Sequence, residues 1–104
     1  MNSAELEAQV IGAISERSEM AIDYKGDGER TVQPHALFRR DAGKVFVDAL
    51  QTGGYSSSRD PNGWRQFELS EIVAARTLET SFEPSGEYDP ASERYKAGLI
   101  KGVA

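Results

Sequence analysis

The stretch at residues 44–51, Lys-Val-Phe-Val-Asp-Ala-Leu-Gln, is the most β-prone run in the sequence. Turn-forming residues bound it on both sides, at residues 41–43 and 52–54. Two segments that begin with an arginine flank it, residues 30–34 before it and residues 65–69 after it. We therefore interpret residues 44–51 as the central strand of a small antiparallel sheet, with arginines on the neighbouring strands.

The size of the chain limits it to one domain with a single core, because it has 104 residues of which 38% are hydrophobic. It contains no cysteine, which excludes disulfides and thiolate metal sites. No run approaches the roughly 18–20 apolar residues of a membrane span. The acidic start at residues 1–7 also lacks the layout of a secretion signal. We expect a cytoplasmic protein without membrane contact.

The net charge of −5 is distributed unevenly along the chain. Residues 1–29 carry seven acidic and two basic side chains, and residues 66–104 carry seven acidic and four basic ones. Residues 30–65 reverse this balance, with six basic and three acidic side chains. An acidic protein repels nucleic acid in general, yet this middle third can offer a local anion site. The alternative for any single arginine is a solvated surface charge.

The first predicted element is a helix from Ser3 to about Arg17, capped by Asn2 or Ser3. Its apolar side chains recur at helical spacing on one face: Leu6, Val10, Ala13 and Ile14. Because a helix of this length is marginal alone, this face must pack on the sheet.

The rest of the periodic sequence predicts five antiparallel strands, at residues 19–25, 30–33, 44–51, 64–69 and 73–82. Pro34 is expected to end or bend the second strand, since proline cannot donate to a ladder of backbone hydrogen bonds. The run of turn formers at residues 52–63 predicts a functional or mobile loop.

The predicted fold class is α+β and mostly β, with the helix packed on a small five-stranded antiparallel barrel of SH3-like or Sm-like type. Chain breakers after Glu83 separate residues 1–83 from a C-terminal tail, residues 84–104. We interpret residues 91–100 as a short docked helix started by Pro90, with a disordered tail as the alternative. The barrel is expected to close without the tail.

Taken in order, these segments resemble the WYL domain, a module of bacterial transcriptional regulators. The matching residues are Ile14 at the end of the helix, residues 22–24, residues 30–34 with Leu37, residues 43–49, and residues 65–69 with Ile72. The resemblance covers residues 9–83 and lies in the order and spacing of five short matches. The family's Trp-Tyr-Leu signature reads Val45-Phe46-Val47 in this chain, so the tyrosine hydroxyl is missing. The resemblance implies a stand-alone WYL-like sensing or binding module.

The resemblance also implies an anion site lined by Arg30 and Arg65, for which nucleotides or single-stranded nucleic acid are the leading ligands. Guanidinium groups suit phosphate because they bond it through two parallel N–H groups and stay charged. The alternative for both arginines is a surface salt bridge. Trp64 beside Arg65 is the aromatic and cationic pairing that single strands use. Phe46 is a core residue or a stacking platform, and Arg39 is plain surface or a further part of the site.

Catalytic and metal-binding patterns are absent from the sequence. His35 is the only histidine, so neither a zinc site nor a histidine relay is credible. We therefore predict a non-enzymatic module without a cofactor or metal, whose partner is an anionic small molecule or a short single-stranded nucleic acid. The alternative function is a protein–protein interaction module, with a protein partner or a second copy bound through a barrel face or an edge strand.

Overall fold

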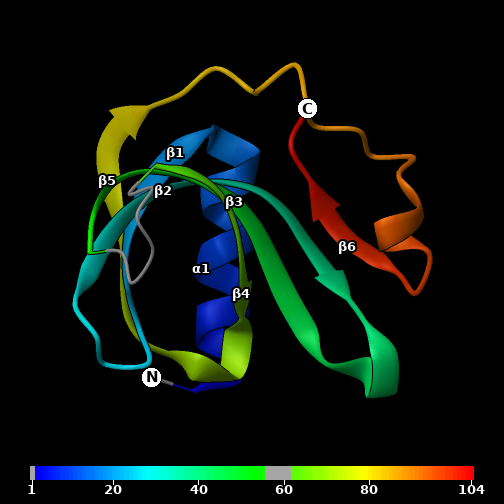
Figure 1. Ribbon diagram of the computed structural model, residues 1–104, viewed down its shortest axis with the longest axis horizontal. Helices are drawn as coiled ribbons and strands as arrows, with labels where there is room; N and C mark the ends of the chain where they lie inside the picture. The colour runs from blue at the N-terminus through cyan, green and yellow to red at the C-terminus, as the bar shows by residue number, and fades with distance from the viewer. Residues whose placement is uncertain (1, 56–61) are drawn as a thin grey trace.

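The computed structural model describes residues 2–55 and 62–104, which form one helix and one six-stranded antiparallel sheet (Figure 1). The elements are α1 (Ser3–Glu16), β1 (Ser18–Tyr24), β2 (Glu29–Arg39), β3 (Val45–Gly54), β4 (Gly63–Glu68), β5 (Ile72–Ser81) and β6 (Leu99–Gly102). The strand order is β4-β3-β2-β1-β5, and β6 pairs with β2. Within this described part, no helix has the length and apolar character needed to cross a membrane.

The sheet curves around α1 and is not closed into a barrel (Figure 1). The mostly β character and the N-terminal helix are confirmed, whereas the closed five-stranded barrel is a wrong prediction. Strands β4 and β5 stand at opposite ends of the strand order. The apolar face of α1 packs against the inner face of the sheet. The helix therefore covers the core, and the strands need not close around it.

Helix α1 begins and ends where the sequence predicts. The Asn2 side chain accepts a hydrogen bond from the Glu5 backbone N–H at 2.8 Å, which satisfies one of the free donors of the first turn. The helix ends at Glu16 and is capped by Arg17, whose left-handed backbone (φ 55°) turns the chain into β1. The four predicted apolar residues of the helix are all buried.

Strand β2 continues through Pro34, where the sequence predicts an end or a bend. The pairing of β2 with β3 shifts register between Pro34 and Ala36, which places a bulge at His35. A bulge tolerates a proline because the ladder is already interrupted there. Before the bulge β2 pairs with β1, and after it β2 pairs with β6.

The C-terminal tail returns to the sheet as a strand, so the predicted helix at residues 91–100 is wrong. Only the turn Glu93–Tyr95 is helical there, of 3₁₀ type, and Gly98 (φ 134°) then directs the chain into β6. The Val103 backbone N–H donates to the His35 carbonyl at 2.8 Å, and the Val103 side chain is buried in the main core. The tail is therefore part of the packed molecule.

Two apolar clusters lie on opposite faces of the sheet. The main core joins α1 to the inner face; its buried members are Leu6, Val10, Ala13, Ile14, Met20, Ile22, Val32, Leu37, Val47, Ala49, Phe67, Leu69, Phe82 and Val103. On the outer face, Ala36 and Phe38 of β2 pack with Tyr95 of the tail. This second cluster holds the tail over the outer face.

Candidate ligand-binding site

Two adjacent clefts, of about 470 and 440 Å³, lie between the sheet and residues 87–97. The aromatic cleft is lined by Asp48, Trp64, Arg65, Gln66, Glu87, Tyr88, Asp89, Ser92, Arg94 and Tyr95. The basic groove is lined by Phe38, Arg39, Arg40, Gln66, Glu93, Arg94, Lys96 and Ala97. The two clefts share Gln66 and Arg94. Each has the volume of an ordinary small-molecule site, roughly 300–1,000 Å³.

Strand alternation brings three of the lining side chains, Asp48, Trp64 and Gln66, to one face. Asp48 of β3 pairs with Gln66 of β4, so both point away from the core that their neighbours Val47 and Phe67 fill. Two positions along β4, Trp64 points to the same face. The floor of the site is thus built from the alternate residues of two paired strands, with the tail as its wall.

The Asp48 carboxylate joins the floor to the wall, because it bonds Arg94 and Tyr95 of the tail. It is 4% exposed and is held by the Arg94 guanidinium through two contacts, Nε to Oδ2 at 2.8 Å and Nη2 to Oδ1 at 2.9 Å. The Tyr95 hydroxyl donates to the same carboxylate at 2.8 Å. Burial and this hydrogen bond raise the pKa of the Tyr95 hydroxyl, so it remains a donor at neutral pH. A buried carboxylate with three donors is a stable anchor for the tail.

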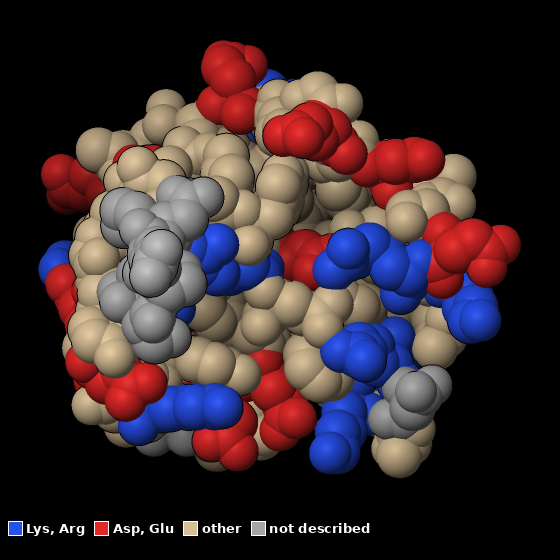
Figure 2. Space-filling model, viewed as in Figure 1, with Lys and Arg blue, Asp and Glu red and all other residues tan. Residues whose placement is uncertain are grey.

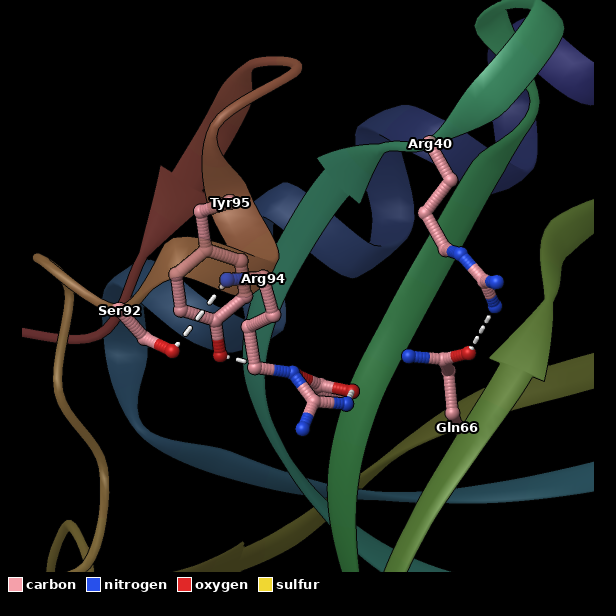
Figure 3. A network of polar contacts seen from close by, with 6 residues as sticks. Arg40, Gln66, Ser92, Arg94 and Tyr95 are labelled. Atoms are coloured by element: carbon pink, nitrogen blue, oxygen red, sulfur yellow. Dashed lines mark hydrogen bonds and ion pairs between the residues drawn. The ribbon is translucent and has the colours of Figure 1, made fainter.

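Arg40 lies at the other side of the floor (Figure 3). Its guanidinium lies over the Phe46 ring, 4.7 Å from the ring centroid, and donates to the Gln66 side-chain oxygen. Arg40 follows β2 and Gln66 lies on β4, so this contact crosses β3. The arrangement presents a cation stacked on an aromatic ring.

The basic groove carries positive charge that no described carboxylate neutralises. Arg39, Arg40 and Lys96 line it, and the ion pairs found among residues 2–55 and 62–104 include none of the three. Arg94 is neutralised by Asp48, which leaves Glu93 as the only free acid of the lining. Figure 2 shows basic side chains gathered where the β2–β3 hairpin approaches the tail. A local surplus of this kind attracts anions even on an acidic protein.

Three of the five predicted site residues line these clefts, and a fourth contacts a lining residue. Trp64 and Arg65 line the aromatic cleft, Arg39 lines the basic groove, and Phe46 lies under Arg40. The Trp64 indole N–H donates to the Glu87 carboxylate at 3.3 Å, and its ring meets the His35 ring edge-on at 4.8 Å. The Arg65 guanidinium donates to the Trp64 carbonyl at 3.0 Å.

Arg30, the fifth predicted residue, lies away from both clefts and is 6% exposed. Its guanidinium lies among three aromatic rings, 5.4–5.7 Å from the centroids of Tyr24, Tyr55 and Phe67. Its only described hydrogen bond goes to the Gln51 side chain at 3.4 Å. Arg30 is therefore a packed interior cation.

Arg30 and Arg65 were predicted to line one site, but their backbone positions lie far apart along the sheet. Arg30 pairs with Gly54 of β3, whereas Arg65 pairs with Ala49. These positions are five residues apart along β3, roughly 16 Å at about 3.3 Å per residue. Half of the loop that was expected to cover such a site, residues 56–61 of 52–63, lies outside the described residues.

The buried His35 side chain connects the sheet to the tail, and both of its ring nitrogens form hydrogen bonds. Its Nε2 accepts a hydrogen bond from the Ser85 backbone N–H at 2.9 Å, so the ring proton is on Nδ1, which donates to the Gln33 carbonyl at 2.8 Å. Burial lowers the pKa of His35, which keeps the ring neutral. The part of the chain that the structure describes contains no group of three or more side chains that could hold a metal ion.

The residues that sequence reasoning missed belong mostly to the tail: Glu87, Tyr88, Asp89, Arg94, Tyr95 and Lys96. They follow the chain breakers and show no strand or helix period. Asp48 and Arg94 are 46 residues apart in the sequence, so no local sequence pattern predicts their contact. The one available signal is composition, because aromatic and charged residues are dense between positions 87 and 96.

Comparison with known proteins gives a likeness at the level of the fold. No family model matches the chain, and no curated protein matches its sequence. Among solved structures, the chain is similar to proteasome accessory factor B/C (PafBC) of Arthrobacter aurescens, with a TM-score of 0.67 and 21% sequence identity. The match covers 82% of this chain and 13% of PafBC, so this chain spans a small part of that protein's length. A likeness at this identity establishes the fold alone, and it supports the WYL-like fold that the order of the segments predicts.

Proposed function

We propose that this chain is a non-enzymatic regulatory module that senses an anionic ligand, a nucleotide or a short single-stranded nucleic acid, in the basic groove. One observation carries the proposal: Arg40 lies over Phe46 in a groove whose free cations, Arg39, Arg40 and Lys96, have no carboxylate partner among the described residues. Trp64 and Arg65 border the neighbouring cleft.

The chemistry of the groove fits a phosphate beside a planar group. Guanidinium forks bond phosphate oxygens in pairs, and a stacked cation–aromatic pair offers a flat surface for a base. The WYL-like order of the segments and the fold shared with part of PafBC are consistent with a regulatory module. Arg30 has no place in the proposed site because its side chain is buried elsewhere.

The test is a thermal-shift titration with nucleotides and short single strands. Binding to the folded state raises the melting temperature by mass action. Arg40→Gln should remove most of the shift, and the shift in the wild type should shrink as salt is raised. Arg76→Gln is the matched control, since Arg76 carries the same charge on β5 and pairs with Glu29 at 2.9 Å. If no anion shifts the wild type, or if Arg40→Gln keeps the full response, the proposed function is wrong.

A second candidate function, protein–protein interaction, is favoured by β5. This strand stands at the end of the strand order, most of its ten residues are exposed, and Val73 is 60% exposed. An unpaired strand edge can accept a strand from another chain. Such binding would be insensitive to salt and to Arg40→Gln, and Val73→Lys on the same strand should weaken it.

A further inference from the structure

The aromatic cleft has the opposite electrostatic character to the basic groove. Its acids are Asp48, Glu87 and Asp89, and its bases are Arg65 and Arg94. Asp48 and Arg94 neutralise one another at 2.8 Å. The remaining charges are the two exposed carboxylates of Glu87 and Asp89 against the single guanidinium of Arg65.

The Arg65 guanidinium is held by a backbone contact, whereas the carboxylates of Glu87 and Asp89 lie at the solvent edge. Arg65 donates to the Trp64 carbonyl at 3.0 Å, which holds one of its N–H groups against β4. Glu87 accepts one hydrogen bond from Trp64, and Asp89 accepts one from the Ala91 backbone N–H at 2.9 Å. Neither acid takes part in an ion pair with the described residues. Their charge is therefore available to a bound cation.

Aromatic rings form the rest of the wall. Trp64, Tyr88 and Tyr95 line the cleft, and the Tyr88 and Tyr95 rings are 6.1 Å apart between centroids. Burial, and after it the negative charges of Asp48 and Asp89, raise the pKa of the Tyr88 hydroxyl. Aromatic faces with nearby carboxylates form the surroundings that bind ammonium groups.

The two clefts are joined at Gln66 and Arg94, so one molecule can occupy both. We propose that the ligand is an amine-bearing anion whose ammonium group lies in the aromatic cleft beside Trp64, Glu87 and Asp89, while its anionic end lies in the basic groove beside Arg40. The assignment of the anionic end rests on the proposed function. The assignment of the ammonium end rests on the aromatic cleft alone.

The test compares two series of probes of equal chain length, n-alkyl phosphates and ω-aminoalkyl phosphates. Trp64 is the only tryptophan in the chain, so its fluorescence reports directly on the aromatic cleft. The aminoalkyl phosphate of the best length should bind about fivefold more tightly than its alkyl counterpart, a gain typical of one exposed cation site. Glu87→Gln with Asp89→Asn should abolish this gain and leave the affinity for the alkyl phosphate within about twofold.

Glu93→Gln provides the matched control, because it removes the same charge from the basic groove. This variant should bind both series more tightly and keep the ratio between them. Equal affinity for the two series in the wild type would overturn the ammonium assignment and leave the anion site standing.

A failure of the proposed function can also be distinguished from a failure of the ammonium assignment. If neither phosphate series binds, the proposed function is wrong, and tetramethylammonium chloride is titrated alone. A change in Trp64 fluorescence that disappears in the Glu87→Gln, Asp89→Asn variant supports the ammonium site by itself. The absence of any change in the wild type overturns it.

Discussion

Buried polar side chains determine much of this structure at the scale of single residues. Arg30, His35, Asp48 and Gln51 are each less than a tenth exposed. Arg30 lies among aromatic rings, His35 bonds two backbone groups, and Asp48 is paired with Arg94. Each therefore exchanges its hydration for specific partners, which makes its position sensitive to substitution.

We expect Asp48→Asn to lower the free energy of unfolding by about 1–3 kcal/mol, the range for lost hydrogen bonds to a charged group. The loss stays moderate because half of the Arg94 side chain is exposed and can regain water. Urea denaturation measures the change. Glu29→Gln is the control, since the ion pair between Glu29 and Arg76 is exposed and should leave the unfolding midpoint nearly unchanged. Equal effects of the two substitutions would contradict the role of Asp48 as an anchor.

Phe46→Tyr adds a hydroxyl at the position where the WYL signature has a tyrosine, and it should change the free energy of unfolding by less than about 0.5 kcal/mol. Phe46 is only half-buried, so its new hydroxyl can reach solvent. Phe38→Tyr is the contrasting variant, because Phe38 is fully buried against the Tyr95 ring at 4.9 Å. An unsatisfied hydroxyl there should cost about 1–3 kcal/mol. A large loss in Phe46→Tyr would show that Phe46 lies too deep to face a ligand.

At the scale of elements, strand β6 packs closely against Tyr88, another residue of the tail. A β-carbon added at Gly102 would overlap the Tyr88 hydroxyl, and the Leu99 side chain is next at 3.3 Å. The Tyr88 hydroxyl itself is buried and has no hydrogen-bond partner among the described residues. Position 102 therefore requires glycine, because the side of β6 that faces Tyr88 has no room for a β-carbon.

Gly102→Ala should destabilise the protein by about 1–3 kcal/mol, as overpacking does. Tyr88→Phe should be neutral or slightly stabilising, because it removes a buried oxygen without a partner. In the double variant the phenylalanine leaves room for the alanine, and most of the loss should be recovered. A double-mutant cycle by chemical denaturation measures this coupling. Additive losses would show that Leu99 or the backbone, and not Tyr88, excludes the β-carbon.

At the scale of the whole molecule, His35 links three parts of the structure. Its ring contacts Trp64 of β4, Phe82 after β5 and Tyr88 of the tail, with centroid distances between 4.8 and 5.8 Å. The neutral ring accepts from Ser85, whereas a protonated ring cannot. The packing of the tail on the sheet thus depends on the charge of one side chain.

This dependence predicts a loss of stability in mild acid. Because the pKa of His35 is lowered in the folded state, the unfolded chain binds a proton first, and the free energy of unfolding falls once the pH drops below about 6.5. Above that value the contribution is fully present. Urea denaturation between about pH 5 and pH 8 should show the slope in the wild type and a flatter profile in His35→Gln, since carboxylates titrate near pH 4. Parallel profiles would exclude His35 as the cause.

The sequence by itself determined the local features of this protein. The cap at Asn2, the apolar face of α1 and the β-prone run of β3 arise from interactions between residues close in the chain, and all three occur as predicted. The alternation of β3 and β4 also assigns Trp64 and Phe67 to opposite faces of the sheet. These features follow from helical and strand periodicity, which a single sequence displays.

Only the tertiary structure decided which distant segments meet. β2 continues through Pro34 because β3 pairs along both sides of the bulge, and the tail becomes a strand because β2 offers it an edge beyond His35. The candidate site follows from the same pairing, which brings Arg94 to Asp48 across 46 residues and leaves Arg30 in the interior. Contacts at such separation depend on the free energy of the whole packed chain, and no local spacing encodes them.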